Sequence, residues 1–148
     1  MKLEVAVLRA CYILVEHFEE IIERKKAGLS AGFHSRIFSH FLHPEMHFVS
    51  AGRSQAVISG DRAHLEHVVP CVVLFNEVCR LLESKLAKEE IARYLSIYWK
   101  VAHISKDEAK MLDSKNKLNL KKSMPSGWDF ETGDTFARLK LAGIELFV

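Results

Sequence analysis

Residues 61–77, DRAHLEHVVPCVVLFNE, place two histidines and a glutamate directly before a proline and an apolar run. Pro70 suits the first turn of a helix, because the amide hydrogen that proline lacks has no helical partner there. From Val73 onward, apolar residues recur at three- and four-residue steps, which is the helical period. The stretch therefore predicts a helix from about Pro70 to Ala87, with a polar segment leading into it.

Other segments also predict helices. Residues 2–27 carry a wide apolar sector, which is typical of a helix that lies in a core or also meets a second subunit. A further long helix is expected in KEEIARYLSIYWKVAHI, residues 88–104. The sequence SKDE, residues 105–108, has the form of a capping box and predicts a short helix after it. Asp134 is a candidate cap for a last helix, TFARLKLA, residues 135–142.

Two short stretches indicate strands. MHFVSA, residues 46–51, and SQAVIS, residues 54–59, are separated by Gly52, and together they predict a small β-hairpin around residues 46–59. The fold class expected is therefore α+β, predominantly α-helical, with about four to five helices. A chain of 148 residues is long enough for one core, so a single globular domain, 1–148, is expected.

Composition narrows the class of protein. Hydrophobic residues make up 49% of the chain and charged residues 27%, the balance of an ordinary globular protein. A net charge of +2 attracts neither nucleic acid nor a membrane overall, so such a contact needs a local patch. Cys11, Cys71 and Cys79 lie in apolar surroundings without a CxxC pair, which indicates buried thiols in a reducing cytoplasm. Charges interrupt the apolar N-terminal run, so we expect neither secretion nor a membrane span.

The histidines are unevenly distributed, which points to a metal site. Neutral imidazole is a favoured ligand of zinc and other transition metals, and neighbouring carboxylates can complete such a site. No HExxH motif or zinc-finger spacing is present, so a set of unrelated surface or part-buried histidines is the competing interpretation. Six of the eight histidines fall within 34 residues: His34, His40, His43, His47, His64 and His67.

LEHVVP, residues 65–70, resembles the first motif of HNH-type (ββα-metal) nucleases. The resemblance implies a divalent ion, Mg²⁺, Mn²⁺, Ni²⁺ or Zn²⁺, bound by Glu66, with His67 as the base that activates water. It also implies an asparagine that orients the base, for which Asn76 is the candidate. The candidates for the remaining metal ligands are His64, His43 and His47.

The same residues also have a structural interpretation. An acidic side chain before a helix interacts favourably with the helix dipole, so Glu66 and His67 can flank the helix that begins near Pro70 without any chemistry. The chain departs from the nuclease pattern at three points, one of which is that no closing histidine stands at the usual spacing. A glutamate stands where aspartate is more usual, and an apolar helix replaces the expected second strand and glycine-rich loop.

The densest basic run, KNKLNLKK, residues 115–122, precedes an apolar segment that contains Trp128. Its lysines can contact phosphate groups, and an exposed tryptophan can stack on a base. A solvated loop with Trp128 buried against its own domain is the other interpretation. The predicted nucleic-acid contacts are Lys115, Lys117, Lys121, Lys122 and Trp128, and Arg53, Arg62 and Arg138 would extend the patch.

Three functions are compatible with these patterns, and the sequence leaves open whether the protein is an enzyme. The first is a divergent metal-dependent nuclease, which predicts that the candidate ligands converge. The second is a non-catalytic protein-interaction module, an inhibitor or adaptor, homodimeric through the first helix or bound to another protein. The third is a nucleic-acid binder without chemistry, whose affinity falls steeply with salt.

Overall fold

The stretch that opens at Asp61 folds into a strand and a helix. The computed structural model describes residues 2–32, 34, 36–38 and 50–148. Strand β2 spans His64–His67 and helix α4 spans Cys71–Glu83. Pro70 directly precedes α4, and its carbonyl accepts a hydrogen bond from the amide of Val73 at 2.9 Å. The predicted helix is confirmed, and the polar segment before it is a strand.

The chain divides into two compact units. The first contains the described residues of 1–48 and 74–97, and the second those of 49–73 and 98–148. Helix α4 begins in the second unit and continues in the first. The α+β class is confirmed, with about half of the chain helical. No helix in the described ranges is both long enough and apolar enough to cross a membrane.

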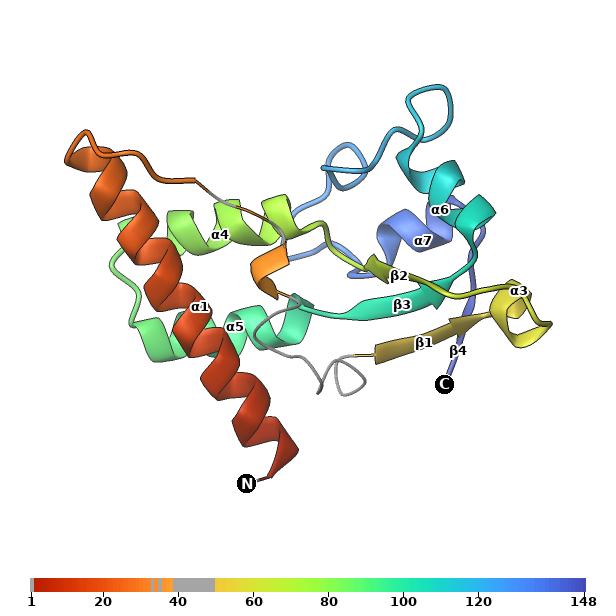
Figure 1. Ribbon diagram of the computed structural model, residues 1–148, viewed down its shortest axis with the longest axis horizontal. Helices are drawn as coiled ribbons and strands as arrows, with labels where there is room; N and C mark the ends of the chain where they lie inside the picture. The colour runs from red at the N-terminus through yellow and green to blue at the C-terminus, as the bar shows by residue number, and fades with distance from the viewer. Residues whose placement is uncertain (1, 33, 35, 39–49) are drawn as a thin grey trace. The chain divides into compact units, whose positions relative to one another are not determined.

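In the described part of the first unit, the long helices are α1, Leu3–Lys26, then α4, then α5, Lys88–Tyr98. In Figure 1, α4 and α5 run in opposite directions and α1 crosses them. The apolar stripe of α1 is buried, and the ring of Phe18 packs edge-on against Phe75 of α4 at 4.9 Å. Lys88 of α5 donates to Glu19 of α1 at 3.2 Å. The helical period at residues 2–27 thus predicts both the helix and its buried face.

A four-stranded mixed sheet forms the centre of the second unit. Its strand order is β2-β3-β1-β4, where β1 is Ser50–Ser54, β3 is Val101–Ile104 and β4 is Leu146–Phe147. Strand β3 pairs antiparallel with β2 and parallel with β1, and β4 pairs antiparallel with β1. The sheet therefore joins strands that lie far apart in the sequence.

Helices α6, Lys106–Asp113, and α7, Ala137–Leu141, cover one face of this sheet (Figure 1). The capping box is confirmed, because Ser105 Oγ accepts from the Glu108 amide and Glu108 Oε1 accepts from the Ser105 amide. Burial of apolar surface stabilises the layers. The buried core joins Val68, Ala102, Ile104, Ala109, Leu112, Leu139 and Ile144.

Two sequence-based expectations are wrong. The hairpin around residues 46–59 does not form, because β1 leads straight into a short helix, α3, Gln55–Ile58. Ser54 caps α3 by accepting from the Val57 amide, which favours a helical turn over a second strand. The part of the hairpin at 46–49 lies outside the described residues. The helix expected over 88–104 ends at Tyr98, and its last residues form β3, which is buried between two strands.

Candidate functional site

A buried ion pair fixes the glutamate of LEHVVP. Glu66 lies on β2, and its Oε1 accepts from Arg138 Nη2 of α7 at 3.0 Å. The Arg138 side chain is fully buried, and Asp113 Oδ1 at the end of α6 lies 3.6 Å from the same nitrogen. Arg138 also donates to the carbonyls of His67 at 2.8 Å and Leu120 at 2.9 Å. The guanidinium thus joins a strand, two helices and a loop.

Burial sets the electrostatics of this cluster. It raises the pKa of Glu66, although the positive charge of Arg138 acts in the opposite direction. Burial, together with Arg138, also lowers the pKa of His67 to about 4, so His67 is neutral at pH 7. A neutral imidazole has the protonation state that a general base needs. Successive strand residues point to opposite faces, however, so Glu66 and His67 do not share a face of the sheet.

The other candidate ligands are only partly brought together. His64 Nε2 lies 3.4 Å from Glu66 Oε2, so both carboxylate oxygens of Glu66 have a nitrogen neighbour from this chain. Asn76 is exposed on α4 and belongs to the first unit. His43 and His47 lie outside the described residues. Within the part of the chain that is described, no three His, Cys, Asp or Glu side chains are arranged to hold a metal ion.

The lysines of the basic run lie on the loop that follows α6. Lys115, Lys117, Lys121 and Lys122 are exposed, while Leu120 between them is buried and anchors the loop. Trp128 is half-buried, and its Nε1 donates to the carbonyl of Asp134 at 2.8 Å. Its ring also packs edge-on against Phe130 at 4.7 Å. Trp128 is therefore engaged within its own loop, whereas the lysines are accessible to solvent.

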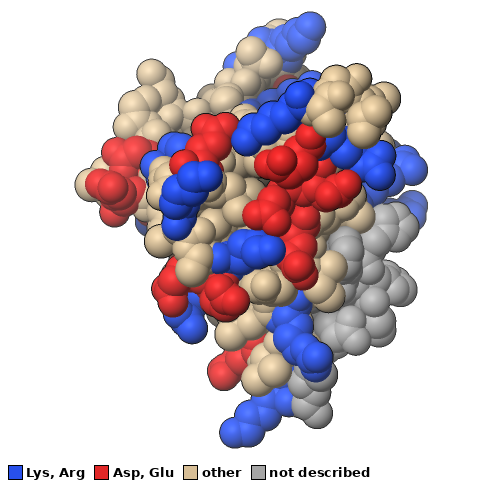
Figure 2. Space-filling model, turned by 90° about the vertical axis from the view of Figure 1, so that its left-hand side faces the viewer, with Lys and Arg blue, Asp and Glu red and all other residues tan. Residues whose placement is uncertain are grey.

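Of the three arginines expected to extend this basic run, Arg53 and Arg62 are exposed and Arg138 is not. Arg138 is buried, so the expectation that it joins a surface patch is wrong. On the face drawn in Figure 2, basic and acidic side chains are interspersed. On α1, Arg24 pairs with Glu20 at 3.0 Å and Lys26 with Glu23 at 3.6 Å. Alternating, paired charges of this kind are typical of a solvated helix surface.

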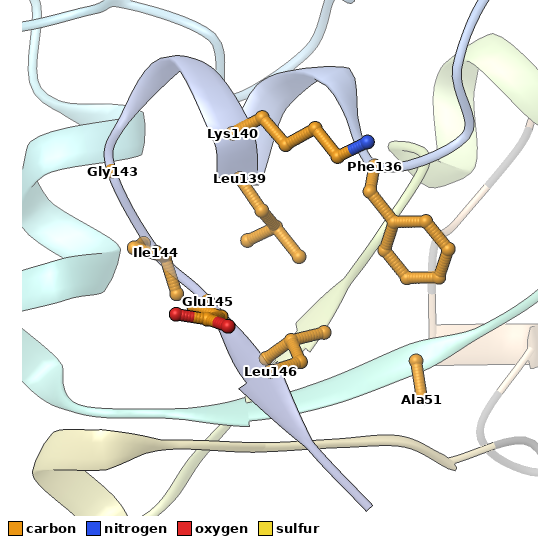
Figure 3. Close-up of a pocket in the computed structure, with 8 residues that line it drawn as sticks. All are labelled: Ala51, Phe136, Leu139, Lys140, Gly143, Ile144, Glu145 and Leu146. Atoms are coloured by element: carbon orange, nitrogen blue, oxygen red, sulfur yellow. The ribbon is translucent and has the colours of Figure 1, made fainter.

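A pocket of about 450 Å³ lies between α7 and the β1–β4 side of the sheet. Figure 3 shows apolar side chains around it, together with the charged residues Lys140 and Glu145. Lys140 is also ion-paired with Asp134. An apolar cavity with a few polar groups is the usual form of a ligand site. The apolar walls come from Ala51, Phe136, Leu139, Ile144 and Leu146.

Sequence patterns did not indicate this pocket, because its walls come from three separate segments. Ala51 lies on β1, Phe136 precedes α7, and residues 143–146 lead into β4. Gly143 has a φ of +73°, a conformation that favours glycine, and it turns the chain from α7 toward β4. In the sequence, Gly143 indicates only that the last helix ends there and that the chain turns.

No protein-family model, no curated protein and no solved structure matches this chain.

Proposed function

We propose that the protein is a non-catalytic interaction module that binds an extended peptide segment of a partner along β4, with one bulky apolar side chain in the α7–β4 pocket. The observation that carries the proposal is an apolar pocket of about 450 Å³ beside the terminal strand of a sheet. Main-chain pairing at a sheet edge supplies affinity, and an adjacent pocket supplies specificity.

The strand order supports an extended peptide as the occupant. β4 pairs with β1 on one side and is the last strand in the order, so within the described ranges its outer edge pairs with no strand. An edge of this kind presents unpaired main-chain donors and acceptors. Leu146 belongs both to β4 and to the pocket wall. A strand added to β4 would therefore lie next to the pocket.

The pocket chemistry supports an apolar residue flanked by polar groups. Five apolar side chains line the cavity, while Lys140 and Glu145 carry opposite charges beside it. Filling such a cavity removes apolar surface from water, and the two charges can contact peptide amides or a polar neighbour. A charged or very small residue at the central position would gain little from this site.

The test is selection from a phage-displayed library of linear peptides against the purified protein. We expect selected peptides to share one bulky apolar residue within a β-forming sequence. Ala51→Leu adds volume inside the pocket and should abolish binding. Ala87→Leu makes the same change at an exposed position in the first unit and should leave binding intact. N-methylation of one peptide backbone amide should also weaken binding, because it removes a main-chain donor.

Two results would overturn the proposal. One is a set of binders that Ala51→Leu does not affect. The other is that small apolar compounds bind in the α7–β4 pocket while the peptide library yields no binder. Metal-dependent nicking of supercoiled plasmid that is lost in His67→Ala would instead support the HNH-type nuclease, which stays a prediction from the sequence.

A further inference from the structure

We infer that the protein has a binding site for a phosphate monoester dianion, formed by Arg62, His64 and Lys106. These three residues, with Ala63, line a second pocket of about 290 Å³. This pocket is lined by none of the residues around the α7–β4 pocket. The inference is therefore independent of peptide binding.

The register of the sheet brings the basic residues together. In the antiparallel pairing of β2 with β3, His64 lies opposite Ile104. Continuing this register two residues beyond the strands places Arg62 opposite Lys106, the first residue of α6. Arg62 lies two residues before His64, the first residue of β2, and both side chains line the pocket. The start of β2 and the start of α6, which follows β3, therefore contribute residues to the same pocket.

The basic side chains of the hollow are only partly paired, since His64 Nε2 lies 3.4 Å from Glu66 Oε2. Arg62 and Lys106 are exposed, and within the described residues neither makes an ion pair of 4.0 Å or less with an acidic side chain. Arg62 and Lys106 carry like charges beside one hollow, and like charges repel each other. A bound anion would remove this repulsion, so ligand binding and fold stability are linked.

Four carboxylates lie near the hollow in the sequence, and none of them lines it: Asp61, Glu66, Asp107 and Glu108. Glu66 is held by Arg138 at 3.0 Å, and its other oxygen faces His64 at 3.4 Å, which helps to fix the imidazole. Glu108 accepts from Ser54 Oγ at 2.6 Å and from the Ser105 amide at 2.8 Å. Neither glutamate lines the pocket.

The donor set favours a phosphate monoester. A guanidinium binds phosphate oxygens in a bidentate manner, an ammonium adds a point charge, and an imidazole N–H adds one more donor. Two fixed positive charges match the charge of a dianion better than the single charge of a phosphodiester.

The test is titration of the ¹⁵N-labelled protein with sodium phosphate, against sodium chloride at matched ionic strength. We expect saturable shifts of the Ala63, His64 and Lys106 amides with phosphate alone, together with a rise in Tm. Arg62→Gln and Lys106→Gln should each weaken binding about tenfold, because each removes a charge-assisted hydrogen bond. Lys110→Gln, one turn further along α6 and outside the pocket, should bind as the wild type does.

Two further ligands identify the source of the phosphate group. A dinucleotide with a 5′-phosphate should compete for the site, and the same dinucleotide without it should not. Tighter binding of the phosphorylated dinucleotide than of inorganic phosphate would indicate a phosphoryl group carried on a larger molecule, and equal binding would indicate free phosphate. Shifts that chloride reproduces, that persist in both Gln variants, or that the unphosphorylated dinucleotide causes equally would each overturn the inference. Circular dichroism checks that the exposed substitutions leave the fold intact.

Discussion

Arg138 Nη2 lies 3.0 Å from Glu66 Oε1, and this pair joins α7 to β2 in the interior of the second unit. The arginine has no exposed surface, and its other nitrogens donate to main-chain carbonyls. Burial of a charge is costly unless hydrogen bonds and an opposite charge compensate it. The glutamate that the sequence assigns to a metal therefore has a structural partner in this chain.

Replacing Arg138 by methionine should destabilise the protein strongly. The change leaves the carboxylates of Glu66 and Asp113 buried without their cation, and loss of one partner from such a pair costs about 3–5 kcal/mol. Urea denaturation measures the free energy of unfolding. Lys140→Met, on the exposed side of the same helix, is the control and should change it by about 0.5 kcal/mol or less. Similar losses in both variants would contradict a special role for the buried pair.

Stability should depend on pH through His67. Its pKa is about 4 in the folded protein and about 6.5 in the unfolded chain, so the unfolded state binds the proton more readily. The stabilisation is complete above pH 6.5 and is lost as the pH falls toward 4, by about 3 kcal/mol.

The comparison of wild type with His67→Gln isolates this contribution. Burial raises the pKa of Glu66, which makes stability fall as the pH rises from 4.5, opposite in sign to the effect of His67. The glutamate is present in both proteins, so the difference in slope between pH 7 and pH 5 reports the histidine. If stability depended on pH equally in both proteins, the pKa of His67 would be the same in the folded and the unfolded state.

Gly52 should be intolerant of alanine because of its neighbour. A Cβ atom at Gly52 would lie 2.6 Å from the carbonyl oxygen of Phe147, on the strand paired with β1. Gly60 has nearly the same φ, +116° against +118°, with nothing within 4 Å of its Cβ position. Both alanine variants carry backbone strain of about 1–3 kcal/mol.

The difference between the two glycine variants then measures the contact alone. We expect Gly52→Ala to lose more stability than Gly60→Ala and to speed hydrogen exchange of the β4 amides. Equal losses would mean that β4 shifts away at no cost.

Ser54, which is buried at the end of β1, should contribute more to stability than an exposed serine does. Its Oγ donates to Glu108 at 2.6 Å and accepts from the Val57 amide at 3.4 Å, so it joins α6 to β1 and caps α3. Ser54→Ala should cost about 1–3 kcal/mol in thermal or urea unfolding. Ser59→Ala removes one exposed hydrogen bond with Gln55 and should cost far less. The assignment fails if the two substitutions are equivalent.

The sequence predicts those helices and caps that depend on residues only a few positions apart. The capping box at Ser105 and Glu108 and the stripe of α1 need only neighbouring residues, and both are confirmed. The apolar residues of β3 continue the period of α5, so the pattern predicts a helix there. Only the position of β3 between β1 and β2 favours a strand. The same limit applies to the sites. Neither the burial of Arg138 nor the presence of Arg62 and Lys106 in one pocket depends on residues that are close in the sequence.

The place of β1 in the sheet has a consequence for folding during synthesis. Arg53 is paired with His103 and with Phe147, both of which leave the ribosome long after it. Pairing of remote segments is slow, because the loop must close before the contact contributes. The helices of the first unit can pack as soon as α5 has emerged, whereas β1 must wait for the residues that flank it. During that interval the unpaired main chain of β1 can pair with strands of other molecules. The same exposure occurs during refolding, so dilution or a chaperone should raise the yield of refolded protein.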